Sequence, residues 1–172
     1  MQVKPLVFDS TPLIYLTKVG LCNIFEDSQV EKCTSPLVKK EVVDKGKIRG
    51  IPDSLVLDRL FDKGIFKVCE PADKKCLGEL LKTHGLHVAD ADVLALTNER
   101  DGIAVSDDEV ARKTAKVYGI KYAGSFYVLA RAICEGIISV AHAKKAVGYM
   151  VSSGWRCSVE SYVKMIEAIE KL

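Results

Sequence analysis

The chain has 172 residues, of which 48% are hydrophobic, so it has the length of about one domain and enough apolar residues for a sizeable core. Its 25 Lys and Arg residues nearly balance its 23 Asp and Glu residues, and the formal net charge of +2 excludes a strong overall attraction to nucleic acid or membranes. No apolar run approaches the roughly 18 to 20 residues that span a bilayer, and no signal-peptide pattern opens the sequence, so we expect a cytoplasmic protein without membrane contact.

Short apolar runs alternate with helical patterns along the chain. The first run, residues 5–9, ends at Asp9, and Ser10-Thr11-Pro12 then supplies a capping hydroxyl and a proline suited to the first turn of a helix. Further strands are predicted at residues 30–34, 65–69, 103–106 and 120–123. Further helices are predicted at residues 35–44, 52–63, 73–83, 90–100, 107–118, 125–135, 139–152 and 158–172, with a basic loop at residues 45–51.

Strands separated by helices form βαβ units with right-handed crossovers and a mostly parallel sheet. We therefore predict an α/β fold, a three-layer α/β/α sandwich. Residues 1–138 are expected to form the main domain, and residues 139–172 a helical extension packed on it. Ligands of such sheets bind outside the carboxyl ends of the strands, which gives most weight to acidic residues at strand-to-helix junctions.

The six cysteines form no CxxC pair and no zinc-like cluster. Most have apolar neighbours, so we expect reduced, buried thiols that pack as small hydrophobic residues. Their even count leaves disulfides open as the alternative.

Asp9 directly follows an apolar strand-like run, so its carboxylate is expected at the carboxyl end of a central strand. The structural alternative is a cap for the next helix, yet Ser10 and Thr11 supply better-placed caps before Pro12. We therefore interpret Asp9 as a functional residue.

Glu41 interrupts the apolar stripe of the helix that begins after Ser35. Its position beside Val42 fits a residue that faces a site. It fits equally well a surface glutamate paired with a neighbouring lysine, and the spacing alone does not separate the two.

Asp90 and Asp92 precede a largely apolar helix. Acidic residues in a first turn stabilise a helix by ~0.3 to 1 kcal/mol, so a structural role is open. Because Asp90 and Asp92 are two positions apart, their side chains point to different faces of the helix, and we expect one of them to face a shared site.

Ser106-Asp107-Asp108-Glu109 matches a capping box, with Ser106 as the cap and Glu109 as its partner. A capping box does not require two further aspartates at the end of a strand. At least one of Asp107 and Asp108 is therefore interpreted as metal-related.

Three or four carboxylates at one edge of a sheet repel one another unless a cation offsets their charge. Oxygen ligands favour the hard ions Mg²⁺ and Mn²⁺. Such a site activates water and stabilises charge on a phosphodiester. The acidic pattern therefore predicts metal-dependent phosphodiester hydrolysis.

The order and spacing of these motifs resemble the PIN-domain family, in particular its prokaryotic VapC-like ribonucleases. The matching segments are residues 7–16, 35–42, 89–96 and 104–120, within a resemblance that covers residues 3–135. It implies an enzyme that cleaves RNA with Mg²⁺ or Mn²⁺, often as a homodimer and often as a toxin silenced by an antitoxin protein. Gly124-Ser125 resembles the Gly-Thr turn of the family.

The resemblance assigns the first three acids of the family to Asp9, Glu41 and Asp90, and the fourth to Asp107 or Asp108, with Asp108 closer to the usual spacing. Asp9, Asp90 and Asp108 are then the principal metal ligands, and Glu41 and Asp107 complete or tune the catalytic site. The supporting residues are Ser10, Asp92 and Ser106.

Two rival enzyme or signalling classes fit less well. A haloacid-dehalogenase-type phosphatase needs an acid two residues after the first, where this chain has Thr11, and a phosphoreceiver domain needs an acidic pair where only Asp9 is present.

A non-catalytic PIN-like module that binds RNA or a protein is the alternative from another class, and the intact set of acids argues against it. Basic residues could contact phosphates in either case, namely Lys39, Lys40, Lys45, Lys47, Arg49, Arg112, Lys113 and Lys116. Apolar residues near the C-terminus at helical spacing predict either core packing or a dimer or partner surface, namely Val159, Tyr162, Val163, Ile166 and Ile169.

Overall fold

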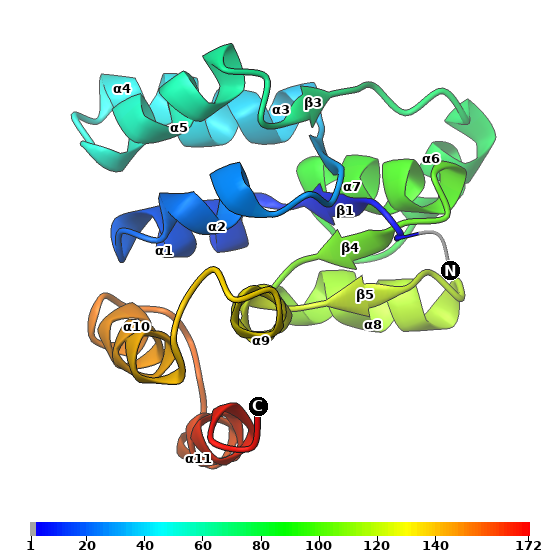
Figure 1. Cartoon of the computed structure of the whole chain (residues 1–172). Coiled ribbons are helices and arrows are strands. Elements are labelled where there is room, and N and C mark those ends of the chain that lie inside the picture. The colour runs from blue at the N-terminus through cyan, green and yellow to red at the C-terminus, as the bar shows by residue number, and fades with distance from the viewer. Residues whose placement is uncertain (1–2) are drawn as a thin grey trace.

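A five-stranded parallel sheet forms the centre of the computed structural model, which describes residues 3–172 (Figure 1). The strands are β1 (Leu6–Phe8), β2 (Lys32–Thr34), β3 (Lys67–Val68), β4 (Ile103–Val105) and β5 (Tyr122–Ala123), in the order β3-β2-β1-β4-β5. The chain winds outward from β1 first through β2 and β3 and then, on the other side, through β4 and β5. The switch point, where such sheets bind ligands, therefore lies between β1 and β4.

Helices cover both faces of the sheet, which confirms the predicted α/β/α sandwich. They are α1 (Ser10–Lys18), α2 (Cys22–Asp27), α3 (Pro36–Lys39), α4 (Gly46–Ile48), α5 (Asp53–Asp62), α6 (Lys74–Leu80), α7 (Val88–Glu99), α8 (Glu109–Val117), α9 (Ser125–Cys134), α10 (Val140–Ser152) and α11 (Val159–Ile169), with a π-helix η1 (Lys40–Lys45) between α3 and α4. No helix within residues 3–172 is long and apolar enough to cross a membrane.

The segment after β2 differs from the prediction of a helix that stops before Gly46. Ser35 caps α3 by accepting a hydrogen bond from Val38 N at 3.2 Å, as expected. The chain then continues as η1 and α4 through Gly46, whose φ of −63° is helical, so the predicted basic loop is partly helix. Glycine is needed here for close packing, because a Cβ at this position would lie 2.6 Å from Ser54 Cβ on α5.

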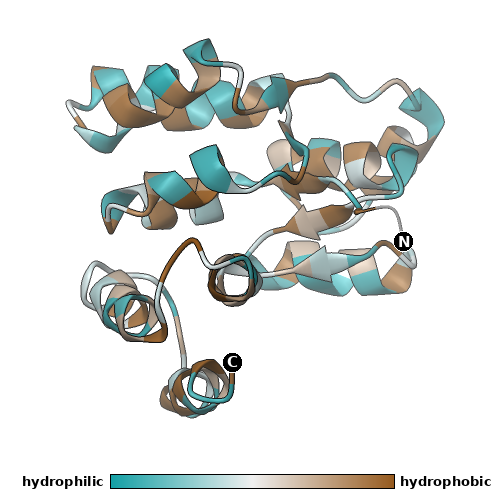
Figure 2. Ribbon diagram, viewed as in Figure 1, coloured by the Kyte–Doolittle hydropathy of each residue, from teal (hydrophilic) through white to brown (hydrophobic). Residues whose placement is uncertain are grey.

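Aromatic residues fill the core beside β1. The Phe8 ring meets the rings of Phe25 and Phe66 edge-on, with 5.6 Å between centroids in each pair. Phe25 lies on α2, a short helix that the sequence analysis missed because its six residues have no side-chain cap. In Figure 2 the ribbon of β4 is hydrophobic along its length, as expected for a strand buried on both faces.

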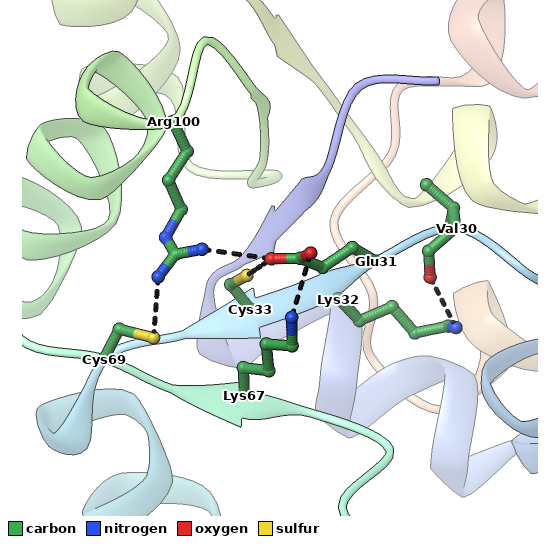
Figure 3. A network of polar contacts seen from close by, with 7 residues as sticks. All are labelled: Val30, Glu31, Lys32, Cys33, Lys67, Cys69 and Arg100. Carbon is green, nitrogen blue, oxygen red and sulfur yellow. Dashed lines mark hydrogen bonds and ion pairs between the residues drawn. The ribbon is translucent and has the colours of Figure 1, made fainter. Parts of the chain in front are cut away.

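A polar network ties the end of α7 to β2 and β3 (Figure 3). Arg100, the C-cap of α7, donates to Glu31 Oε1 at 3.0 Å and to Cys69 Sγ at 3.0 Å. Glu31 also pairs with Lys67 at 3.0 Å. These contacts fix the position of α7 against the sheet, and α7 carries Asp90.

All six cysteines are free. Cys33 is buried and Cys134 is exposed, while the other four are half-buried, so the expectation that these thiols are generally buried was wrong. Burial raises the pKa of the Cys33 thiol to about 12, which suits an inert packing residue.

The C-terminal helices pack on the same core. Figure 1 shows α10 and α11 beyond α9, at the end of the molecule where the C-terminus lies. Met150, Trp155 and Ile169 are buried and belong to one core cluster with the residues of β1.

Candidate functional site

Asp9 lies where the chain leaves the central strand β1 and begins α1. Its backbone N–H donates to Val105 O at 3.0 Å, which continues the pairing of β1 with β4. Its side chain accepts hydrogen bonds from Ser10 N at 2.6 Å and from Ser106 Oγ at 3.0 Å. Asp9 is therefore both the N-cap of α1 and a buried acid, 5% exposed. The expectation that Ser10 or Thr11 caps this helix was wrong, since the helix begins at Ser10.

Asp90 reaches the same edge of the sheet from the first turn of α7. α7 packs against β1 and β4, and this packing leaves Asp90 only 6% exposed. Asp92 is also buried, at 7%, but two residues along a helix correspond to a rotation of about 200°, and Asp92 does not line the cavity that Asp90 lines. One acid of the pair faces the site.

Glu41 comes from η1. A π-helix has wider turns than an α-helix and is often found at functional sites. Glu41 is exposed, and its Oε2 accepts a hydrogen bond from Ser10 Oγ at 3.0 Å. This contact joins the helix that follows β1 to the helical segment that follows β2.

Ser106 connects two of the acids. Its hydroxyl donates to Asp9 Oδ2 at 3.0 Å and accepts from Asp108 N at 3.2 Å. The predicted capping box at Ser106 was wrong: Asp108 is the N-cap of α8, with its Oδ1 accepting from Ala111 N at 2.8 Å, and Glu109 pairs with Lys113 instead. With Asp108 as the cap, the helix starts two residues later than the box requires.

Four carboxylates, those of Asp9, Glu41, Asp90 and Asp108, line one cavity of about 490 Å³ at the carboxyl edge of the sheet. They come from four separate segments of the chain. The remaining lining residues are Ser10, Thr11, Leu37, Lys40, Lys45, His87, Val88 and Ala89. His87 was not predicted from the sequence, although its position three residues before Asp90, at the N-cap of α7, was a usable signal.

The charges in this cavity are destabilised by burial and by one another. Burial raises the pKa of Asp9 to about 7, helped by the nearby charge of Asp90, while the hydrogen bonds from Ser10 and Ser106 oppose the rise. Burial also raises the pKa of Asp90 to about 6, helped by the charge of Asp108. Ionisation of Asp9 and Asp90 in the metal-free site therefore destabilises the folded protein.

The donor set fits a hard divalent cation. Within residues 3–172, none of the four carboxylates forms an ion pair with Lys, Arg or His. Over the same range, no three His, Cys, Asp or Glu side chains are grouped closely enough to form a ready-made metal site. Unpaired carboxylates repel one another, and a bound cation would offset their charge. Carboxylate oxygens are the ligands that Mg²⁺ and Mn²⁺ prefer.

Asp107 turns away from this cavity. Its Oδ1 accepts from Ser125 N at 2.8 Å, and its Oδ2 accepts from Ser125 Oγ at 2.5 Å and from Trp155 Nε1 at 2.9 Å. Asp107 was predicted to be one of the catalytic acids, and Trp155 was not singled out from the sequence. In the structure Asp107 connects the loop before α8 to α9 and to the segment between α10 and α11.

A family model described as a PIN domain matches residues 5–171. The match includes all five strands and the C-terminal helices. No curated protein matches the chain.

Proposed function

The chain belongs to the PIN-domain family, and on this premise we propose that it is a metal-dependent ribonuclease that hydrolyses RNA phosphodiester bonds. One observation carries the proposal: Asp9, Glu41, Asp90 and Asp108 share a cavity, and within the described residues none of the four forms an ion pair. A haloacid-dehalogenase-type phosphatase is set aside, since the family is a different one.

Asp9, Asp90 and Asp108 would hold Mg²⁺ or Mn²⁺, with Glu41 at the rim. When bound, such an ion supplies Lewis acidity, which lowers the pKa of water and offsets charge on phosphate oxygens. Ser10 N and Ser106 Oγ each hold one oxygen of Asp9, so that carboxylate is oriented before any ligand arrives.

Glu41 is the residue placed to move a proton. Ser10 Oγ donates to Glu41 Oε2, and among residues 3–172 no hydrogen bond to Oε1 is formed, so Oε1 can accept a proton from an attacking water. Lys40 and Lys45 line the same cavity, and their ammonium groups can bind the phosphates on either side of the scissile bond.

Incubation of the purified chain with single-stranded RNA tests the proposal. Cleavage should require Mn²⁺ or Mg²⁺, stop with EDTA and be lost in Asp9→Asn. Asp27→Asn, an exposed acid on α2, is the matched control and should cleave normally. Cleavage that persists both in EDTA and in Asp9→Asn would overturn the proposal, and RNA binding without any cleavage would favour the non-catalytic module.

We extend the proposal to a cytoplasmic toxin that acts as a homodimer and is silenced by an antitoxin. Support comes from large exposed apolar side chains on α10 and α11, with Tyr149 at 62%, Val159 at 82% and Val163 at 47% exposure, since such patches mark interfaces. Light scattering should give a dimer mass for the whole chain and a monomer mass for a chain ending at Ser153. A small open reading frame directly upstream would separate a toxin from a processing nuclease.

A further inference from the structure

A second cavity, of about 430 Å³, lies beside the carboxylate cavity between α8, α9 and the start of α11. Asp107 lines this cavity, whereas the next residue, Asp108, lines the first one. Ala123 and Gly124, at the end of β5, also line it. Both cavities therefore open at the carboxyl edge of the same sheet, separated by the loop before α8.

The charged side chains of this second cavity are mostly basic. Arg112, Arg156 and Lys164 line it. Lys164 pairs with Glu160, but in the part of the chain that the structure describes, Arg112 and Arg156 form no ion pair with a carboxylate. Arg112 lies over the Tyr122 ring, 5.6 Å from its centroid, which leaves its N–H groups without a carboxylate partner. Two exposed arginines without a carboxylate partner favour an anionic ligand, and a guanidinium group binds phosphate through two parallel hydrogen bonds.

The single acid of the cavity does not repel such a ligand strongly. Asp107 accepts three hydrogen bonds, from Ser125 N, Ser125 Oγ and Trp155 Nε1. These donors disperse its negative charge and hold it against the wall of the cavity. They also fix the chain around Trp155, and the next residue is Arg156.

Aromatic side chains form another part of the wall. Phe126 and Tyr127 are half-buried on α9, and the Trp155 ring is 7% exposed. Sites for single-stranded nucleic acid combine basic groups with aromatic faces on which bases stack. The volume of this cavity also lies within the roughly 300 to 1,000 Å³ typical of small-ligand sites.

We propose that this second cavity binds one nucleotide of the substrate strand, with its phosphate on Arg112 and Arg156 and its base against the aromatic wall. This inference rests on the proposed function for the identity of the strand, because a chain crossing the loop before α8 would present its next phosphodiester to the carboxylate cavity. Arg112 and Arg156 thus hold the RNA while the carboxylates act on it.

Fluorescence anisotropy with a labelled single-stranded RNA of about ten nucleotides tests this, in EDTA so that the strand stays intact. The variant Arg112→Ala/Arg156→Ala should bind the RNA at least about tenfold more weakly. The slope of the logarithm of its binding constant against the logarithm of the salt concentration should become shallower by about one per lost arginine. Both arginines are exposed, so the variant should fold, and its circular dichroism checks this. Arg59→Ala, an exposed arginine on α5, is the matched control. Affinity equal to that of the control overturns the inference.

Cleavage kinetics with Mn²⁺ separate this inference from the proposed function. The double variant should raise KM at least about tenfold and leave kcat within about threefold, because the arginines bind the strand and do not touch the reacting bond. Unchanged KM in an active enzyme overturns the inference alone. If the unmodified chain cleaves no RNA while the double variant still loses RNA binding, the proposed function fails and the second site stands.

Competition with adenosine monophosphate distinguishes a strand from a free nucleotide. If the cavity binds part of a strand, half-displacement of the labelled RNA should need a far higher concentration of adenosine monophosphate than of unlabelled RNA. The reason is that the strand also contacts Lys40 and Lys45. Displacement by equal concentrations of the two would overturn the assignment to the substrate strand.

Discussion

Trp155 Nε1 donates a 2.9 Å hydrogen bond to Asp107 Oδ2, across 48 residues of sequence. The bond joins the segment between α10 and α11 to the loop that carries Ser106 and Asp108. The C-terminal helices are thereby attached to the residue that adjoins one of the proposed metal ligands.

Loss of this bond should loosen the C-terminal segment. Trp155→Phe keeps an aromatic ring but removes the donor to a carboxylate, and we expect a loss of about 1.5 to 3 kcal/mol in the free energy of unfolding, measured with urea. Asp107→Asn retains an acceptor and should cost less. In a double-mutant cycle the two effects should be strongly non-additive, and simple additivity would show that the bond contributes nothing.

Removal of the charge at Asp9 should have opposite effects on activity and stability. Asp9→Asn should reduce Mn²⁺-dependent cleavage by at least about a hundredfold, because a principal ligand is lost. Without metal at pH 8, the same variant should unfold at a higher temperature than the unmodified chain, since it lacks a buried charge beside Asp90. A lower melting temperature at pH 8 would contradict the electrostatic description of the cavity.

The metal-free protein should lose stability as the pH rises. The pKa of Asp9 is about 7 and that of Asp90 about 6, both above the ordinary value of about 3.9, so the folded state binds these protons more tightly than the unfolded state. The stabilisation is complete below about pH 4 and is lost as the pH passes through 6 and 7. Thermal unfolding in EDTA between pH 4 and 8 measures this loss.

Divalent cations should reverse that loss. Mn²⁺ binds the ionised carboxylates of the folded state, so its addition at pH 8 should raise the melting temperature, and subsequent EDTA should lower it again. At pH 4 the gain should be much smaller, because Asp9 and Asp90 are protonated. An equal gain at both pH values would place the cation elsewhere on the protein.

Ser106 should be needed for its hydroxyl. Ser106→Ala removes the donor to Asp9 and the acceptor for Asp108 N, so we expect about a tenfold to hundredfold loss of Mn²⁺ affinity, read from the metal dependence of cleavage. Ser106→Thr retains the hydroxyl and should restore most of that affinity. If the alanine variant binds Mn²⁺ normally, Ser106 does not orient the site.

Two helical glycines should respond oppositely to alanine. Gly46→Ala would place a Cβ 2.6 Å from Ser54 Cβ, and the overpacking should cost about 1 to 3 kcal/mol. Gly78→Ala on α6 meets no atom within 4 Å and should add about 0.5 to 1 kcal/mol through helix propensity. Urea unfolding of both variants measures the difference, and a tolerated Gly46→Ala would mean that α5 can move.

Sequence patterns predicted the layered fold because the central strands β1 and β4 are short apolar runs, and the residues that follow each of them include a helix cap and an acid. Asp9 was predicted in this way, because its position at the end of a strand was enough to place it at the carboxyl edge of the sheet. The choice between Asp107 and Asp108 was beyond such patterns, because consecutive side chains on an extended loop point to opposite sides. Trp155 was missed for a related reason: its partner is 48 residues away, and no local spacing reports that contact.

The wide turn of η1 makes the position of Glu41 in the candidate site depend on the length of the chain at this point. A residue added to or removed from an α-helix rotates everything on one side of it by about 100° relative to the other side. Deleting a single residue between Ser35 and Gly46 would let this stretch relax into regular α-helix. Either Glu41 would then turn away from the cavity, or Gly46 would lose its contact with α5. This short stretch should therefore be sensitive to a change in its length as well as to substitutions at Glu41 and Gly46.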